Sequence, residues 1–212
     1  MSIGLKSDSS GTSGSIVING SDKIVVTSAG NVTAGTFTGA VVGNVTGNVT
    51  GSLTAGGSVN LATTTVSTSG TAIDFTSIPS WAKKVSVLFN KVGISGTSDM
   101  LVQLGTSGGI QGTNYEAQAS VVNTSVATLN STSGFPIRNV EAAARISGIM
   151  TIAGMGSNLW VMSGTLTVIG GVASVQMVAG VIQLSGVLDR VRINALAAET
   201  FDEGSLNIMY EG

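Results

Sequence analysis

The sequence predicts an all-β protein in two parts, an extended Gly-rich amino-terminal arm with an intertwined neck, and a carboxyl-terminal jelly-roll-like β-sandwich. Two observations lead to this prediction. Between residues 35 and 54 a four-residue unit repeats without a break. After about residue 71, short segments alternate apolar and polar residues and are separated by Gly- or Asn-containing turns, which is typical of a sandwich or a jelly roll. We favour the jelly roll, although sequence pattern alone does not fix the strand order.

The composition indicates a chain that covers much of its surface with other copies of itself. Only 9% of the residues are charged, compared with about 25% in typical soluble domains. The hydrophobic fraction is nevertheless 42%, which is too high for a disordered chain. A chain this apolar and this poor in charge is expected to be an obligate oligomer.

We expect three regions along the chain. Residues 1–34 form a docking arm with a β-hairpin, residues 35–70 form a shaft or neck, and residues 71–212 form the head domain. The hairpin is predicted from two β-branched runs, 16–18 and 24–26, that flank the turn sequence Asn19-Gly20-Ser21-Asp22.

The shaft prediction depends on five consecutive tetrads, each of which begins with Gly and has an apolar third residue. A period of four is a multiple of two, so in an extended chain these apolar residues share one face. One strand cannot bury such a stripe alone, and a fixed repeat usually means that copies stack or pair. We therefore predict an interface between copies at Phe37, Val41, Val45, Val49 and Leu53.

In the head, alternation assigns residues to the interior strand by strand. Val85, Val87 and Phe89 are expected to point inward, opposite Lys84, Ser86 and Asn90. Inward positions are also expected for Trp160 and for the following residues, listed in chain order: Val140, Ala142, Ala144, Ile146, Met150, Ile152, Met162, Leu166 and Val168. Residues 141–145 could instead form one helical turn. Residues 175–184 are apolar on both faces, as expected of a strand between a core and a neighbouring subunit.

The residues that usually carry catalysis are scarce. Histidine and cysteine are absent, which removes the Ser-His-Asp triad, the usual imidazole base and the thiolate ligands of zinc. The only adjacent acidic pair, Asp202-Glu203, precedes Gly204 and is expected in an exposed turn. We therefore expect no enzyme, no cofactor and no metal. Distant acids could still assemble a glycosidase pair.

The sequence also bears on partners. No basic cluster is larger than Lys83-Lys84, so nucleic-acid binding is not expected. No transmembrane helix is expected, and the start of the sequence lacks the apolar segment of a signal peptide, so we expect the protein to fold inside the cell that makes it.

Four residues are candidates for ligand contact, Asp99, Tyr115, Glu116 and Trp81. Tyr115 lies beside a Gly-rich loop and is the aromatic residue expected to be exposed. Trp81 lies at a loop-to-strand corner, where it could plug one end of the sandwich, stack on a sugar or anchor an interface. Trp160 is expected in the core.

Several stretches resemble virion proteins of tailed bacteriophages. The amino-terminal segment of many fibre-like phage proteins is similar to residues 4–33, GLKSDSSGTSGSIVINGSDKIVVTSAGNVT. The tetrads resemble their repetitive shafts. A β-rich head domain that recurs in such proteins is similar to FTSIPSWAKKV at 75–85, QLSGVLDRVRI at 183–193 and FDEGSLNIMYE at 201–211.

This resemblance implies a homotrimer in a virion that is assembled in the cytoplasm of a bacterial host. Residues 1–30 would attach it to other virion proteins (capsid, portal, collar or tail), and the head would bind a host surface glycan or protein. The twenty tetrad residues span at most ~65 Å when fully extended, which favours a short tail or head fibre or spike. The alternatives are a decoration or cement protein that stabilises the capsid, and a depolymerase spike that cleaves surface polysaccharide.

Overall fold

The computed structural model describes residues 5–7, 14–16, 59–139 and 141–212, and these contain strands, turns and loops but no helix. The chain divides into two units, Met1–Val49 and Thr50–Gly212. In the first unit, β1 (Leu5–Ser7) pairs antiparallel with β2 (Gly14–Ile16). The predicted partner run at 24–26 lies outside the described residues. So do all five predicted shaft residues, which are Phe37, Val41, Val45, Val49 and Leu53.

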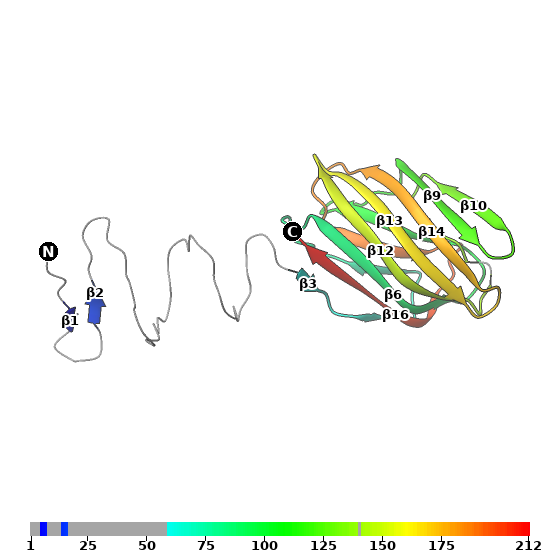
Figure 1. The fold of residues 1–212 in the computed structure, drawn as a ribbon, viewed down its shortest axis with the longest axis horizontal. Helices are drawn as coiled ribbons and strands as arrows, with labels where there is room; N and C mark the ends of the chain where they lie inside the picture. Colours follow the sequence, from blue (N-terminus) through cyan, green and yellow to red (C-terminus); the bar gives the residue numbers. More distant parts are fainter. Residues whose placement is uncertain (1–4, 8–13, 17–58, 140) are drawn as a thin grey trace. The chain divides into compact units, whose positions relative to one another are not determined.

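The second unit is a β-sandwich of two antiparallel sheets (Figure 1). The larger sheet has nine strands in the order β10-β9-β14-β13-β12-β6-β16-β3, and β4 also pairs with β16. In chain order these are β3 (Val59–Leu61), β4 (Thr65–Val66), β6 (Lys84–Ile94), β9 (Tyr115–Val122), β10 (Val126–Ser131), β12 (Arg145–Gly156), β13 (Leu159–Ile169), β14 (Ser174–Gln183) and β16 (Phe201–Glu211).

The smaller sheet has five strands in the order β11-β7-β15-β5, and β8 also pairs with β7. They are β5 (Ala72–Phe75), β7 (Met100–Thr106), β8 (Gly109–Ile110), β11 (Phe135–Ile137) and β15 (Arg190–Ala195).

The strand pairs are nested, as in a single long hairpin that has been folded into two sheets. From the outside inward, β3 and β4 pair with β16, β5 with β15, β6 with β12, β7 with β11, and β9 with β10. Successive pairs lie alternately in the larger and the smaller sheet. This is the topology of a jelly roll, in which the meander β12-β13-β14 occupies the place of one strand. The predicted fold class is confirmed for the described part of the chain.

The inward alternation is also confirmed at the described positions, with the exception of Ala142. Val85, Val87 and Phe89 are buried, and so is Trp160. The hairpin between β12 and β13 turns at Ser157 and Asn158, whose φ angles of 50° and 61° are both left-handed. Two consecutive positive φ angles give a turn whose twist matches that of the flanking strands.

Residues 141–144 differ from both sequence-based interpretations. The Ala144 N–H donates to the Glu141 carbonyl oxygen at 3.0 Å, so this segment is a tight turn and neither a strand nor a helix. Ala142, which we expected to point inward, is exposed, and Val140 lies outside the described residues. Small alanine side chains gain little from burial, and they therefore fix the strand boundary poorly.

The sandwich begins earlier in the chain than the sequence suggested. Residues 59–66, which we assigned to the neck, contribute β3 and β4 to the edge of the larger sheet. The Asn207 side-chain amide binds this segment, because Nδ2 donates to the Ala62 carbonyl oxygen at 3.0 Å and to Thr64 Oγ1 at 3.1 Å. The head therefore includes the chain from Val59 onward, whereas we expected it to begin at residue 71.

Candidate interaction surfaces

The outer face of the larger sheet carries two neighbouring rows of side chains that cross six strands. The strand register aligns Asn207, Leu88, Ile149, Thr165, Met177 and Ser120 in one row. It aligns Met209, Ser86, Thr151, Ser163, Ala179 and Gln118 in the next. None of these residues is charged. Ile149 and Met177 are 50% and 52% exposed, although both lie in the middle of the sheet.

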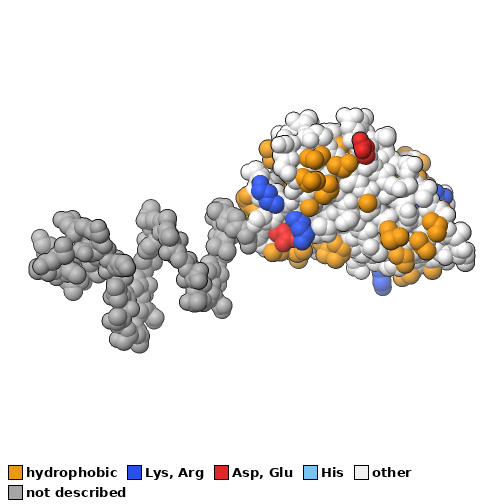
Figure 2. Space-filling model, turned by 45° about the horizontal axis from the view of Figure 1, so that its top comes forward, with side chains coloured by type: hydrophobic (Ala, Val, Ile, Leu, Met, Phe, Trp, Pro, Cys, Tyr) orange, Lys and Arg blue, Asp and Glu red, His pale blue; other side chains and the backbone are white. Residues whose placement is uncertain are grey.

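Charged side chains on this face lie at its margins. The next row toward one end of the strands begins with Glu211 and Lys84, which form an ion pair, and finishes with Glu116. Near the opposite end, Arg145 pairs with Glu203. Figure 2 shows hydrophobic and uncharged side chains over the middle of the visible face and charged ones toward its periphery. The neighbouring strands β13 and β14, which lie inside the sheet, contain no charged residue.

A shallow hollow of about 420 Å³ lies where residues 59–66 meet this face. Leu61 and Thr64 form one wall, and Leu88 and Ile149 form part of the floor. Leu61 is 64% exposed although it borders an apolar hollow. The edge segment that follows the tetrad repeat therefore extends the apolar surface of the sheet.

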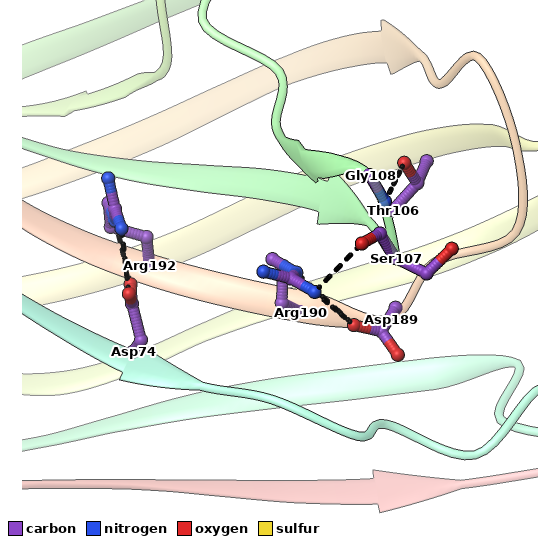
Figure 3. Close-up of polar contacts among 7 residues, drawn as sticks. All are labelled: Asp74, Thr106, Ser107, Gly108, Asp189, Arg190 and Arg192. Carbon is purple, nitrogen blue, oxygen red and sulfur yellow. Dashed lines mark hydrogen bonds and ion pairs between the residues drawn. The ribbon is translucent and has the colours of Figure 1, made fainter.

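The outer face of the smaller sheet has a different character (Figure 3). Arg192 on β15 donates two hydrogen bonds of 2.7 Å to the carboxylate of Asp74 on β5. Arg190 donates to Asp189 at 2.9 Å and to the Ser107 carbonyl oxygen at 3.3 Å. The hydrogen bond from Arg192 is the main reason that the pKa of Asp74 lies below its usual value. This face presents paired charges, as expected of a surface in contact with water.

Asp99 belongs to a network of loops at one end of the sandwich. Its carboxylate accepts a hydrogen bond of 2.9 Å from the Asn139 backbone N–H, and the buried Asn139 amide donates to the Gly96 carbonyl oxygen. In the same region, Glu199 accepts hydrogen bonds from the backbone N–H groups of Thr97 and Ser98 at 3.0 and 2.9 Å. The Ser98 hydroxyl also donates to Glu199, and it is the main cause that lowers the pKa of Glu199. Asp99 therefore has a structural partner.

Tyr115 is buried, so the expectation that it is an exposed aromatic residue is wrong. Only 1% of it is exposed, and its ring packs edge-on against Phe135 with centroids 5.1 Å apart. Its hydroxyl accepts a hydrogen bond of 2.7 Å from the Leu104 N–H and contacts the Leu104 carbonyl oxygen at 3.4 Å. Burial raises the pKa of Tyr115 to about 12. The sequence error arose because Tyr115 follows a Gly-rich loop but is already the first residue of β9.

Trp81 lies shortly before β6 begins. It is partly buried against the core, and its ring lies 5.8 Å from that of Tyr210. Close by, a hollow of about 190 Å³ is lined by residues that include Lys83, Asn158 and Trp160. The Trp160 Nε1 atom is buried without a hydrogen-bond partner. Since it is shielded from solvent, a molecule in the hollow could reach it only if the surrounding side chains moved.

The four candidate ligand residues do not form one site. Asp99 immediately precedes β7, whereas Tyr115 contacts Leu104 near the other end of that strand. Glu116 is exposed at the margin of the larger sheet, on β9. Trp81 precedes β6, which is separated from β9 by β12, β13 and β14, a distance of about 19 Å at ~4.8 Å per strand. Sequence reasoning missed Leu88 and Ile149, although both are apolar residues at outward positions of alternating strands.

The described residues were searched for metal sites and for membrane-spanning helices. In that part of the chain, no group of three or more acidic residues is placed to hold a metal ion. It also includes no helix that is long and apolar enough to cross a membrane.

The chain was compared with protein-family models, with curated proteins and with solved structures, and none of them matches it.

Proposed function

We propose that this chain is a structural protein of a bacteriophage virion, a short homotrimeric fibre or spike that binds rather than catalyses. Its amino-terminal residues attach to the particle, the tetrad repeat joins three copies in a neck, and the jelly-roll head faces outward for attachment to the host surface. The resemblance of the amino-terminal segment, the tetrads and the head to phage fibre proteins motivates this proposal.

The main support for the proposal is the short connection between the tetrad repeat and the head. The tetrad repeat, which one chain cannot bury, finishes a few residues before Val59, where the chain enters the edge of the larger sheet as β3. The repeat is thus joined to the head without an intervening domain. The charged outer face of the smaller sheet, with Asp74 and Arg192 at its surface, suits the side of such a head that meets water.

Attachment by a trimeric head does not need one deep pocket. Three identical weak contacts made by one rigid particle gain affinity from their effective concentration, by a factor of about 10²–10⁴. The loop ends and the charged face of the smaller sheet are the surfaces available for such contacts.

The decisive experiment is competition for the host surface. Purified full-length protein is added to host cells before the phage, and the adsorption of the phage is measured. We expect reduced adsorption and direct binding of the protein to the cells. Protein that forms trimers but neither binds cells nor competes would contradict the attachment role.

A decoration protein of the capsid is the second candidate, and the uncharged outer face of the larger sheet favours it, since such a face could lie on capsomers. Capsids that lack the protein should then bind it in solution and resist heat better once it is bound. A deletion of residues 1–30 separates the two roles. It should abolish incorporation of a fibre that docks through its arm, and it should leave incorporation intact if the head itself lies on the capsid.

A further inference from the structure

The structure assigns an occupant to the uncharged outer face of the larger sheet: we propose that this face packs against other copies of the same chain. The inference rests on the proposed multi-copy function and specifies which surface of the head the copies share. It concerns the row through Ile149, Thr165 and Met177, the neighbouring uncharged row, and the hollow beside Leu61.

The first argument is the distribution of charge between the two outer faces. The larger sheet keeps its ionisable side chains at the margins, whereas the smaller sheet carries Asp74, Arg190 and Arg192 on its face. An antiparallel sheet whose outer face meets water usually alternates apolar residues inside with polar residues outside. The larger sheet does carry Thr, Ser, Asn and Gln outward, but Leu88, Ile149 and Met177 lie among them in one row, and Ile149 and Met177 are 50% and 52% exposed. Apolar side chains that gather on an exposed face are typical of a surface that contacts a partner.

The second argument is the size of the face. Five strands from β6 to β9 span about 24 Å at ~4.8 Å per strand, and about ten residues along each span ~33 Å. The product is close to 800 Å², which is about the area that each partner buries in a specific and stable protein interface. This area includes the margins with Lys84, Glu116 and Arg145, so the whole face, margins included, is large enough for a stable contact. The two middle rows contain no side chain whose charge would have to be desolvated.

The third argument is where the tetrad repeat arrives. It leads into β3 at the edge of this sheet, and Leu61 from that segment lines the same hollow as Leu88 and Ile149. Copies joined along their repeats would therefore begin their head contact at this edge. The apolar residues Val59 and Leu61, which are 61% and 64% exposed, lie in the segment that would connect the two contact regions.

Single cysteines can test this packing, because the sequence contains no cysteine of its own. Thr165→Cys places a thiol in the middle of the proposed interface. Thr76→Cys is a matched control, because Thr76 is also an exposed threonine but follows β5 of the smaller sheet. Both variants of the full chain are treated with a maleimide reagent, and the molar mass in solution is measured in parallel.

We expect the thiol at position 165 to react roughly tenfold or more slowly than the one at position 76, and we expect denaturant to remove the difference. A trimeric mass together with equal reaction rates would overturn the inference and leave the proposed function intact. A monomeric mass would overturn the homotrimer of the proposed function and the shared face with it. Thr165→Lys provides a second test, since a buried ammonium there should lower the trimer fraction roughly tenfold or more, whereas Thr76→Lys should leave it unchanged.

Discussion

Replacement of Tyr115 by phenylalanine removes one oxygen atom from the core and leaves its packing nearly unchanged. The hydroxyl accepts a hydrogen bond of 2.7 Å from the Leu104 N–H on β7, and thus takes the role that a backbone carbonyl of a neighbouring strand would have. In Tyr115→Phe this N–H is left buried without an acceptor, while the aromatic contact with Phe135 persists.

The expected loss of stability follows from that orphaned donor. A buried polar group left without its hydrogen-bond partner costs about 1–3 kcal/mol, and we expect Tyr115→Phe to lower the free energy of unfolding by about 2 kcal/mol. For a chain of 212 residues this corresponds to a decrease in Tm of roughly 4–8 °C.

A second effect appears only at high pH. Burial raises the pKa of Tyr115 to about 12 in the folded protein, and the unfolded value is about 10. Between these values the unfolded chain releases the phenolic proton while the folded chain keeps it. Stability therefore falls as the pH rises, by about 2.7 kcal/mol for two pKa units. The loss begins near pH 10 and is complete above about pH 12, and the Tyr115→Phe variant should lack it.

Both effects are measured by denaturant unfolding at fixed protein concentration, with circular dichroism as the signal, at a series of pH values from 7 to about 12. The chain has only two tyrosines, so Tyr210→Phe is a matched control that also leaves Tyr115 as the only phenol for an ultraviolet titration. A Tyr115 pKa near 10 in that variant, or a Tyr115→Phe protein as stable as the parent at pH 7, would refute the reasoning.

Three further predictions concern other contacts. Glu199→Gln should lower Tm, because the uncharged amide holds the Ser98 region less firmly. Since the folded pKa of Glu199 is lowered, the stability it provides should decline as the pH falls through that pKa, and the variant should lose this part of the acid dependence when the Tm is measured against pH. Gly180→Ala should cost about 1–3 kcal/mol in denaturant unfolding, because its Cβ would lie 2.7 Å from a backbone oxygen of β9; an unchanged midpoint would contradict this. Asp74→Asn should cost less than ~1 kcal/mol, since its ion pair with Arg192 is partly exposed; a double-mutant cycle gives the coupling.

The candidate residues show where sequence reasoning lost accuracy. Alternation placed Val85 and Trp160 correctly, because a half-buried strand imposes a period of two on its own side chains. The same local view misjudged Tyr115, because its burial depends on contacts with Leu104 of β7 and with Phe135, which the residues next to Tyr115 in the sequence do not reveal.

The contact between Asp99 and Asn139 was equally invisible in the sequence, because it joins residues 40 positions apart. Proximity of Asp99, Tyr115 and Glu116 along the chain suggested one loop cluster. Asp99 lies just before the start of β7, whereas Tyr115 contacts Leu104 near the end of that strand, so most of the length of β7 separates them.

The sequence by itself determined the all-β class, the inward alternation of the head strands and the apolar character of both faces of residues 175–184. These are local properties, since each depends on a residue type and a period along one strand. The tertiary structure decided the nested strand order, the early start of the sandwich at β3, and the alignment of Leu88, Ile149, Thr165 and Met177 in one uncharged row. That alignment depends on register between strands remote in sequence, and register is set by long-range pairing that no single segment encodes.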